Sequence, residues 1–213
     1  MDRPLRFHDH ISIIYKKSSH RVGVLMRLRN VLPTGTKLQI FKAAILPYLT
    51  YCHLLWHFCR ASDSRKLERV QERALRAIYC NRWSSYEKLL NMANLCTMRN
   101  RRLQDIAGHM YKVKNNTCPK HIADLFQRTD TKYLLRNEEF VIPRLNTITH
   151  RKHSIRYIGP KLWNLLPKKV REFPTLSVFK QHILQLDLNS LLVDAQCSGC
   201  SPCSASWTHY YFY

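Results

Sequence analysis

Apolar residues recur at helical spacing through the first half of the chain. Residues 22–32 and 38–56 are rich in Leu, Ile, Met, Phe and Ala, and Pro33 and Gly35 between them are typical of a turn. Pro47 lies inside the second stretch and has no amide hydrogen to donate, so we expect the helix to kink or restart there. The pattern predicts two helices, the second of them interrupted.

The next predicted helix has one apolar and one cationic side, and Ser62 or Asp63 is its expected N-cap. Four apolar residues recur at spacings of three, four and four and so share one face: Leu67, Val70, Ala74 and Ile78. Four arginines fall within about 80° of one another on roughly the opposite face: Arg65, Arg69, Arg73 and Arg76. One side is predicted to pack and the other to present guanidinium groups.

Three further helical segments follow from caps and periodicity. Ser84 and Glu87 form a capping box that predicts a short helix. A longer helix is expected over residues 98–115 and a last one over residues 175–188, with one or two helical turns at 161–166 between them.

Two short runs in the C-terminal half have β character. Residues 140–143 and 154–158 are rich in β-branched and aromatic side chains, and a polar basic stretch separates them. We therefore expect a small two-stranded element near residues 139–158. The predicted fold class is mainly α, a helical bundle followed by a small α+β C-terminal region.

Net charge is the most informative property of the composition. The 213 residues contain 35 Lys and Arg against 14 Asp and Glu, a formal net charge of +21, while 45% of the residues are hydrophobic. That apolar content is enough for a core and excludes a disordered basic tail. Such an excess predicts a polyanionic partner, nucleic acid first and an anionic membrane surface second, which would need an amphipathic or lipidated anchor.

The positive charge is concentrated in two stretches without any acidic residue, 10–62 and 140–171. We expect nine side chains of the first half to contact backbone phosphates, which position a nucleic acid without reading its bases. They are Lys16, Lys17, Arg21, Arg27, Arg29, Arg65, Arg69, Arg73 and Arg76. Tyr48, Tyr51 and Trp56 could stack on bases, but core packing is the favoured interpretation. Solvated surface is the alternative for the arginine face.

Catalytic patterns are missing from the sequence. Polymerases and nucleases that use two metal ions need clustered carboxylates, and no Asp-Asp or Asp-x-Asp cluster occurs. The adjacent Glu138 and Glu139 are interpreted as solvated surface. The chain also has no Gly-rich phosphate loop and no nucleophile elbow, so we predict no enzymatic activity and no cofactor.

The cysteines and the longest uncharged segment indicate where in the cell the protein is expected. The first ten residues are charged and lack the apolar core of a signal peptide, so the cysteines are expected to be reduced, intracellular thiols, with nucleus and cytoplasm both open. The longest uncharged run, 43–59, has 17 residues and contains Pro47, which predicts a buried helix and not a membrane span.

The C-terminal tail, residues 191–213, carries a possible metal pattern. Cys197, Cys200, Cys203 and His209 are four potential zinc ligands. Their short spacing leaves almost no loop to turn back around an ion, which favours a disordered Cys/Ser-rich tail over a zinc site.

Several blocks of the sequence resemble blocks of one protein family and occur in the same order along the chain. Residues 28–33 (LRNVLP), 38–52 (LQIFKAAILPYLTYC) with Trp56, and 67–76 (LERVQERALR) are similar to the segment just after the palm in reverse transcriptases of non-LTR retrotransposons, jockey-like elements in particular. The C-terminal blocks resemble the region that ends those polyproteins: Arg136-Asn137, 141–144 (VIPR), 153–167 (HSIRYIGPKLWNLLP) and Phe179-Lys180. The resemblance covers residues 22–186.

The resemblance implies the thumb and C-terminal extension of an RNA-directed DNA polymerase, the parts that grip template and primer. The catalytic aspartates and the Mg²⁺ of that family belong to the palm, upstream, and the F/Y-x-D-D box is absent here. We therefore expect a truncated gene model, a decayed copy or a separately retained fragment. Its expected parts are residues 1–21 as a remnant preceding the thumb, 22–126 as the thumb-like domain, 127–190 as the C-terminal region and 191–213 as the tail.

The leading functional hypothesis is a non-catalytic fragment that binds RNA or DNA template-primer through its backbone, with no membrane partner. One alternative is an interaction module that docks on a palm and fingers domain in trans or on another chain, through Leu162, Trp163, Leu165 and Leu166. Another is the end of a longer, active polymerase.

Overall fold

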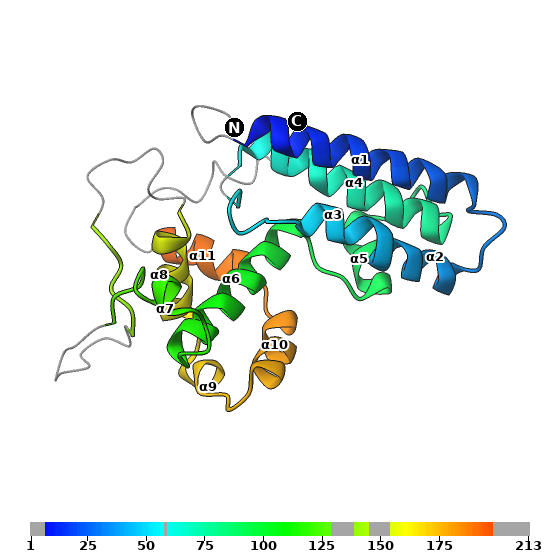
Figure 1. The fold of residues 1–213 in the computed structure, drawn as a ribbon. Coiled ribbons are helices and arrows are strands. Elements are labelled where there is room, and N and C mark those ends of the chain that lie inside the picture. The colour runs from blue at the N-terminus through cyan, green and yellow to red at the C-terminus, as the bar shows by residue number, and fades with distance from the viewer. Residues whose placement is uncertain (1–6, 58, 129–138, 145–153, 198–213) are drawn as a thin grey trace. The chain divides into compact units, whose positions relative to one another are not determined.

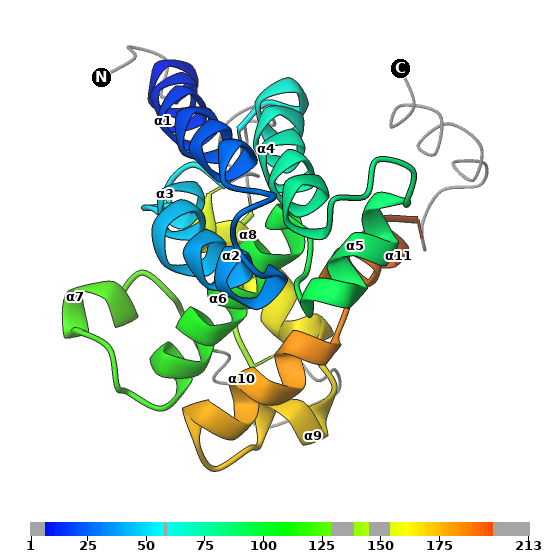
Figure 2. The ribbon, with the colours of Figure 1, turned by 90° about the vertical axis from the view of Figure 1, so that its right-hand side faces the viewer.

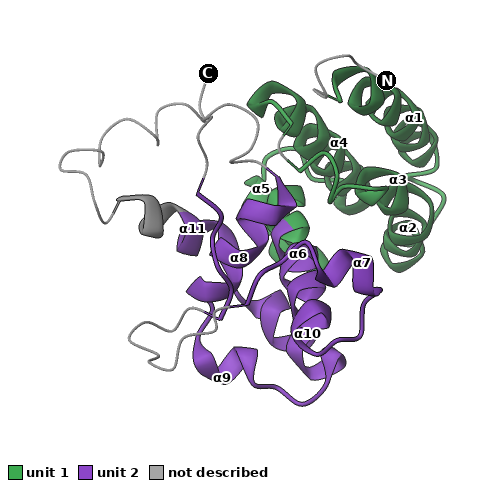
Figure 3. Cartoon of the chain, turned by 60° about the vertical axis from the view of Figure 1, so that its left-hand side comes forward, with its two compact units in different colours: residues 1–102 green, residues 103–213 purple. Residues whose placement is uncertain are grey.

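The computed structural model describes residues 7–57, 59–128, 139–144 and 154–197, and divides into two compact units, Met1–Arg102 and Leu103–Tyr213 (Figure 3). The division falls inside one helix, α6 (Met98–Lys114), and not at the expected boundary after residue 126. The mainly helical class is confirmed in the described residues.

Two long helices lie side by side in unit 1, α1 (His8–Arg27) and α4 (Ala61–Tyr79) (Figures 1 and 2). The shorter α2 (Thr34–Ile40), α3 (Leu46–Thr50) and α5 (Tyr86–Ala93) complete the unit with the first turn of α6. The core that α1 contributes consists of Ile11, Ile14, Val22 and Leu25. Because α1 begins at His8 and packs along α4, the expected boundary at residue 21 lies in the middle of a core helix.

The predicted apolar face of α4 is confirmed. Leu67, Val70, Ala74 and Ile78 are each at most 1% exposed. The helix begins earlier than expected, with Arg60 and not Ser62 or Asp63 at its N-cap. Asp63 is instead buried in the first turn, where its carboxylate accepts hydrogen bonds from His8 and Lys66.

The interruption predicted at Pro47 is confirmed. A five-residue π-helical turn, Phe41–Ile45, follows α2, and α3 then begins at Leu46 with Pro47 in its first turn. Proline is tolerated at that position because the first amides of a helix have no intrahelical acceptor. Trp56 is 1% exposed, which confirms core packing for this residue, whereas Tyr51 is 64% exposed.

The short helix predicted from a capping box is α5, one residue later than expected. Ser85 and not Ser84 is the N-cap, and its hydroxyl accepts a hydrogen bond from the backbone amide of Lys88 at 3.3 Å. Glu87 lies in the first turn, where a carboxylate is favoured by the helix dipole.

Unit 2 consists of the rest of α6 with α7 (Lys120–Ala123), α8 (Ile155–Leu165), α9 (Lys168–Arg171), α10 (Leu176–Gln185) and α11 (Leu188–Cys197). Its core contains a cluster of aromatic rings. The rings of Tyr111 and Phe179 lie 4.7 Å apart, those of Trp163 and Phe179 lie 5.8 Å apart, and those of Phe140 and Trp163 lie 6.3 Å apart. The last helix predicted from the sequence corresponds to α10, with Thr175 as its N-cap.

The expected two-stranded element is wrong for the described residues. Residues 155–158 begin helix α8, and Phe140 makes only an isolated antiparallel bridge with Arg128. The backbone of Phe140 is paired with a side chain: its amide donates to Oδ1 of Asn164 at 3.3 Å, and its carbonyl accepts from Nδ2 at 2.8 Å. The Asn164 side chain on α8 thus makes hydrogen bonds to the Phe140 backbone of the kind that a neighbouring strand would make.

Helix α8 packs closely because it carries a glycine at its contact point. A Cβ at Gly159 would lie 2.8 Å from Sδ of Met110 and 3.4 Å from the ring of Phe126. The residues proposed for docking belong to this helix and its C-cap, Leu166, and their burial does not favour that role. Leu162, Trp163 and Leu166 are at most 2% exposed and Leu165 is half-buried, so they form the core of unit 2.

The interpretation of Glu139 as solvated surface is also wrong. Its carboxylate accepts a hydrogen bond from the indole of Trp163 at 2.8 Å and lies 3.3 Å from the ammonium of Lys114 and 3.6 Å from the guanidinium of Arg171. Arg171 is 2% exposed. The carboxylate therefore compensates a buried cation. Glu138 lies outside the described residues.

Three of the four potential zinc ligands, Cys200, Cys203 and His209, lie outside the described residues, and Cys197 ends α11. Within the described part, no group of three or more His, Cys, Asp or Glu side chains is placed to hold a metal ion. None of the described helices is both long and apolar enough to span a bilayer. Five described cysteines, Cys52, Cys59, Cys80, Cys96 and Cys118, form no disulfide bond.

Candidate nucleic-acid interface

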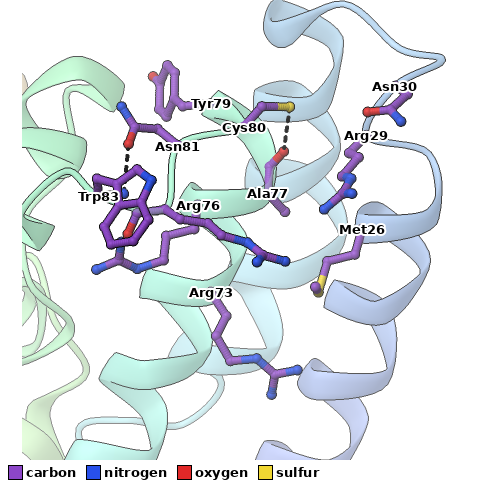
Figure 4. A pocket seen from close by; sticks show the side chains of 11 residues that line it. Met26, Arg29, Asn30, Arg73, Arg76, Ala77, Tyr79, Cys80, Asn81 and Trp83 are labelled. Carbon is purple, nitrogen blue, oxygen red and sulfur yellow. Dashed lines mark hydrogen bonds between the residues drawn. The ribbon is translucent and has the colours of Figure 1, made fainter.

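One pocket of unit 1 gathers several of the predicted phosphate contacts (Figure 4). It has a volume of about 700 Å³ and lies between the end of α1, the second half of α4 and the loop that joins α4 to α5. Its lining residues are Met26, Arg29, Asn30, Arg73, Arg76, Ala77, Tyr79, Cys80, Asn81, Arg82 and Trp83.

Four arginines line this pocket, and no acidic side chain of the described residues does. Arg29, Arg73 and Arg76 belong to the nine predicted contacts, whereas Arg82 was not singled out from the sequence. In Figure 4, Arg29 enters from the α1 side, and Arg73 and Arg76 extend from α4. The pocket is therefore a concentration of positive charge, which favours an anionic ligand.

Helix α4 fixes two of the four arginines. Its buried residues Ala74 and Ala77 pack inward, which directs Arg73 and Arg76 away from the core. Arg76 is held in place, because it donates to Oε1 of Glu72 from Nε at 3.1 Å and from Nη2 at 2.7 Å, and from Nη1 to the carbonyl of Arg82. Its charge is partly neutralised, whereas Arg73 is exposed.

Lys37 of α2 is a buried lysine that contacts residues at the ends of α1 and α4. Lys37 is only 3% exposed, and its ammonium donates to the carbonyl of Arg29 at 3.0 Å and lies 3.8 Å from Sγ of Cys80. Cys80 ends α4 in the left-handed conformation with φ of 52°, which turns the chain into the following loop. The backbone that carries Arg29 is thereby tied to the end of α4.

The loop after α4 is shaped by an asparagine. Oδ1 of Asn81 accepts hydrogen bonds from the backbone amides of Trp83 and Ser84, both at 3.0 Å, an arrangement typical of an Asx-turn. The turn holds Arg82 and Trp83 at the pocket, and Trp83 is 96% exposed. An aromatic ring next to four guanidinium groups is a combination that nucleic-acid-binding surfaces use.

Arg21, another predicted phosphate contact, instead makes contacts within unit 1. Its guanidinium donates to the carbonyl of Ala44 at 3.0 Å and to the hydroxyl of Tyr48 at 2.7 Å, and it lies 4.0 Å from the centre of the Tyr48 ring. These contacts join α1 to the π-helical turn and α3. Arg21 is therefore a structural residue of unit 1.

The remaining predicted contacts do not line the pocket. Lys16, Lys17 and Arg27 are exposed on α1, and Arg69 is exposed on α4. Arg65 is half-buried, and its Nε donates to the carbonyl of Ala61 at 3.4 Å. The structure thus brings together only Arg29, Arg73 and Arg76 of the nine.

Sequence reasoning missed Arg82 and Trp83. The only available signal was the segment Asn81-Arg82-Trp83-Ser84 between two helices, where a tryptophan stands among turn residues and outside any apolar periodicity. A tryptophan in such a turn has no helix face through which to reach the core.

A buried carboxylate with two cationic partners joins the start of α1 to the start of α4, at the ends of these helices away from the pocket. The Asp63 carboxylate is fully buried and lies 3.0 Å from Nδ1 of His8 and 3.0 Å from Nζ of Lys66. Burial by itself would raise the pKa of Asp63, but the hydrogen bonds from His8 and Lys66 outweigh it and hold the pKa below its ordinary value of 3.8. Together with Lys37 at the other end, this cluster fixes the two helices that carry the pocket.

Comparison of the chain with protein-family models, with curated proteins and with solved structures finds no match.

Proposed function

We propose that unit 1 binds nucleic acid through the sugar–phosphate backbone, without choice of sequence. The observation that carries the proposal is the pocket in which Arg29, Arg73, Arg76 and Arg82 converge without an acidic lining residue among the described ones. Guanidinium groups bind phosphate oxygens in a bidentate manner, which makes arginine well suited to this ligand.

The energetics favour a polyanion over a single small anion. Cations gathered in one pocket repel one another, and a ligand with regularly spaced phosphates relieves this repulsion at several positions at once. Lys16, Lys17, Arg27 and Arg69 are exposed on the same two helices and can add contacts along an extended strand. The net charge of +21 raises the local concentration of such ligands.

The family resemblance of the sequence supports the same proposal of nucleic-acid backbone binding. A thumb grips template-primer through a basic face on a helical bundle, and unit 1 has a helical bundle with a basic pocket. We propose RNA or DNA template-primer as the ligand and assign no catalytic residue to this chain, since the carboxylate cluster of a polymerase does not occur in its sequence.

The test is equilibrium binding of the full chain to labelled nucleic acids of unrelated sequence. Fluorescence anisotropy with several duplexes and RNAs of equal length is expected to give affinities within a few-fold of one another, because phosphate contacts carry no sequence information. The absence of binding at low ionic strength, or a strong preference for one sequence, would overturn the proposal.

A further inference from the structure

Trp83 combines near-complete exposure with a fixed backbone. The side chain is 96% exposed, although burying an aromatic ring is ordinarily favourable. Its amide and that of Ser84 are held by Asn81, so the turn presents the indole at a defined place. Packing within the described part of unit 1 does not explain this side chain.

The surroundings of Trp83 are cationic. Arg82 precedes it in the same turn, and the indole shares the pocket with Arg29 and Arg73 (Figure 4). In that view Trp83 and Arg29 lie at opposite ends of the pocket. A flat apolar face and several guanidinium groups are therefore available to one ligand.

A nucleotide in a single strand matches both features. Its base has a π-face that stacks on an aromatic side chain, and its phosphates can pair with arginine. In a blunt duplex the interior bases are already stacked on their neighbours, so their faces are not accessible. An exposed ring at a cationic pocket thus fits unpaired nucleotides better than a duplex, for which the arginines alone would suffice.

We infer that this pocket binds single-stranded nucleic acid, with a base stacked on Trp83 and neighbouring phosphates on Arg29, Arg73 and Arg82. Arg76 is assigned a positioning role, because Glu72 and the carbonyl of Arg82 hold its guanidinium. The inference rests on the proposed backbone binding and adds to it a preference for unpaired over paired nucleotides.

The experiment compares the full chain with Trp83→Ala and Trp83→Phe. Anisotropy titrations at low ionic strength use a labelled single strand of about 12 nucleotides and a blunt duplex that contains the same strand. Stacking contributes about 1–3 kcal/mol per base, so Trp83→Ala is expected to weaken single-strand binding by about 5- to 150-fold. Duplex affinity is expected to change by less than about twofold, and Trp83→Phe, which keeps a ring, to retain most single-strand affinity.

The outcomes separate the two proposals. If the unsubstituted chain binds neither probe, backbone binding fails, and the single-strand inference fails with it. If it binds both probes but Trp83→Ala leaves single-strand affinity unchanged, or weakens both equally, only the single-strand inference is overturned. Equal thermal midpoints for the variants, expected because residue 83 is exposed, show that any loss does not come from unfolding. As a second variant, Arg82→Ala is expected to weaken binding of both probes.

Discussion

Nδ1 of His8 lies 3.0 Å from the buried carboxylate of Asp63, and this contact joins the first turn of α1 to the first turn of α4. Lys66 completes the cluster from the next turn of α4. The two helices form the walls of the arginine pocket at their other ends, so the cluster supports the proposed site from a distance.

Asp63→Asn is expected to destabilise unit 1 at neutral pH by about 1–3 kcal/mol, because it removes the charge of a buried carboxylate that is paired with His8 and Lys66. The folded-state pKa of Asp63 lies below its ordinary value of 3.8, so its carboxylate stabilises the fold above that value. This contribution is lost as the pH falls from about 4 through the folded-state pKa. Urea unfolding followed by circular dichroism at pH 7 and pH 3 measures it.

The matched control for that experiment is Asp124→Asn, which removes the charge of an exposed aspartate. It is expected to leave the unfolding midpoint unchanged within about 0.5 kcal/mol. An Asp63→Asn variant whose loss of stability does not shrink as the pH falls below the ordinary pKa of 3.8 would contradict the assignment, because protonation of the folded-state carboxylate must remove its stabilising effect.

Arg21 should affect stability more than binding. Arg21→Ala removes two hydrogen bonds and the contact with the Tyr48 ring, so we expect a loss of about 1–3 kcal/mol in unfolding free energy. Arg27→Ala, an exposed change on the same helix, is expected to cost less than about 0.5 kcal/mol. Chemical denaturation of both variants checks this. Equal stabilities would mean that Arg21 does not join α1 to α3.

The sequence was informative where local pattern and packing agree. The apolar positions of α4 and the break at Pro47 follow from periodicity and from the missing amide of proline, both of which are local. The prediction was wrong for the segment that begins α8. Ile155 and Ile158 favour strands locally, whereas burial of Leu162 in the core of unit 2 favours a helix. Tertiary contacts decided between the two.

The candidate site, too, could be predicted only where local pattern determines it. Helical spacing placed Arg73 and Arg76 together, but nothing local predicted that Lys37 would bring the carbonyl of Arg29 to the end of α4. Trp83 was overlooked because turn geometry, and not a hydrophobic period, determines its place. Contacts between residues distant in sequence could not be deduced from one chain.

Glu139 offers a test in unit 2. Glu139→Gln removes the charge that lies near Lys114 and Arg171, and because Arg171 is buried, we expect a loss of about 1–3 kcal/mol in stability. Glu172→Gln, an exposed change next to the end of α9, is the control. Thermal unfolding of both variants is the measurement, and a Glu139→Gln variant as stable as the control would contradict the proposed compensation of Arg171.

The salt dependence of binding tests the phosphate contacts most directly. For the unsubstituted chain on duplex, log K is expected to fall linearly with log salt concentration, with a slope of about −0.9 per phosphate contact. Arg29→Ala, Arg73→Ala and Arg82→Ala should each reduce the magnitude of this slope by about 1, whereas Lys88→Ala, an exposed change on α5 with the same loss of charge, should leave it unchanged. A flat salt response, or arginine variants with the same slope as Lys88→Ala, would contradict nucleic-acid binding at the arginine pocket.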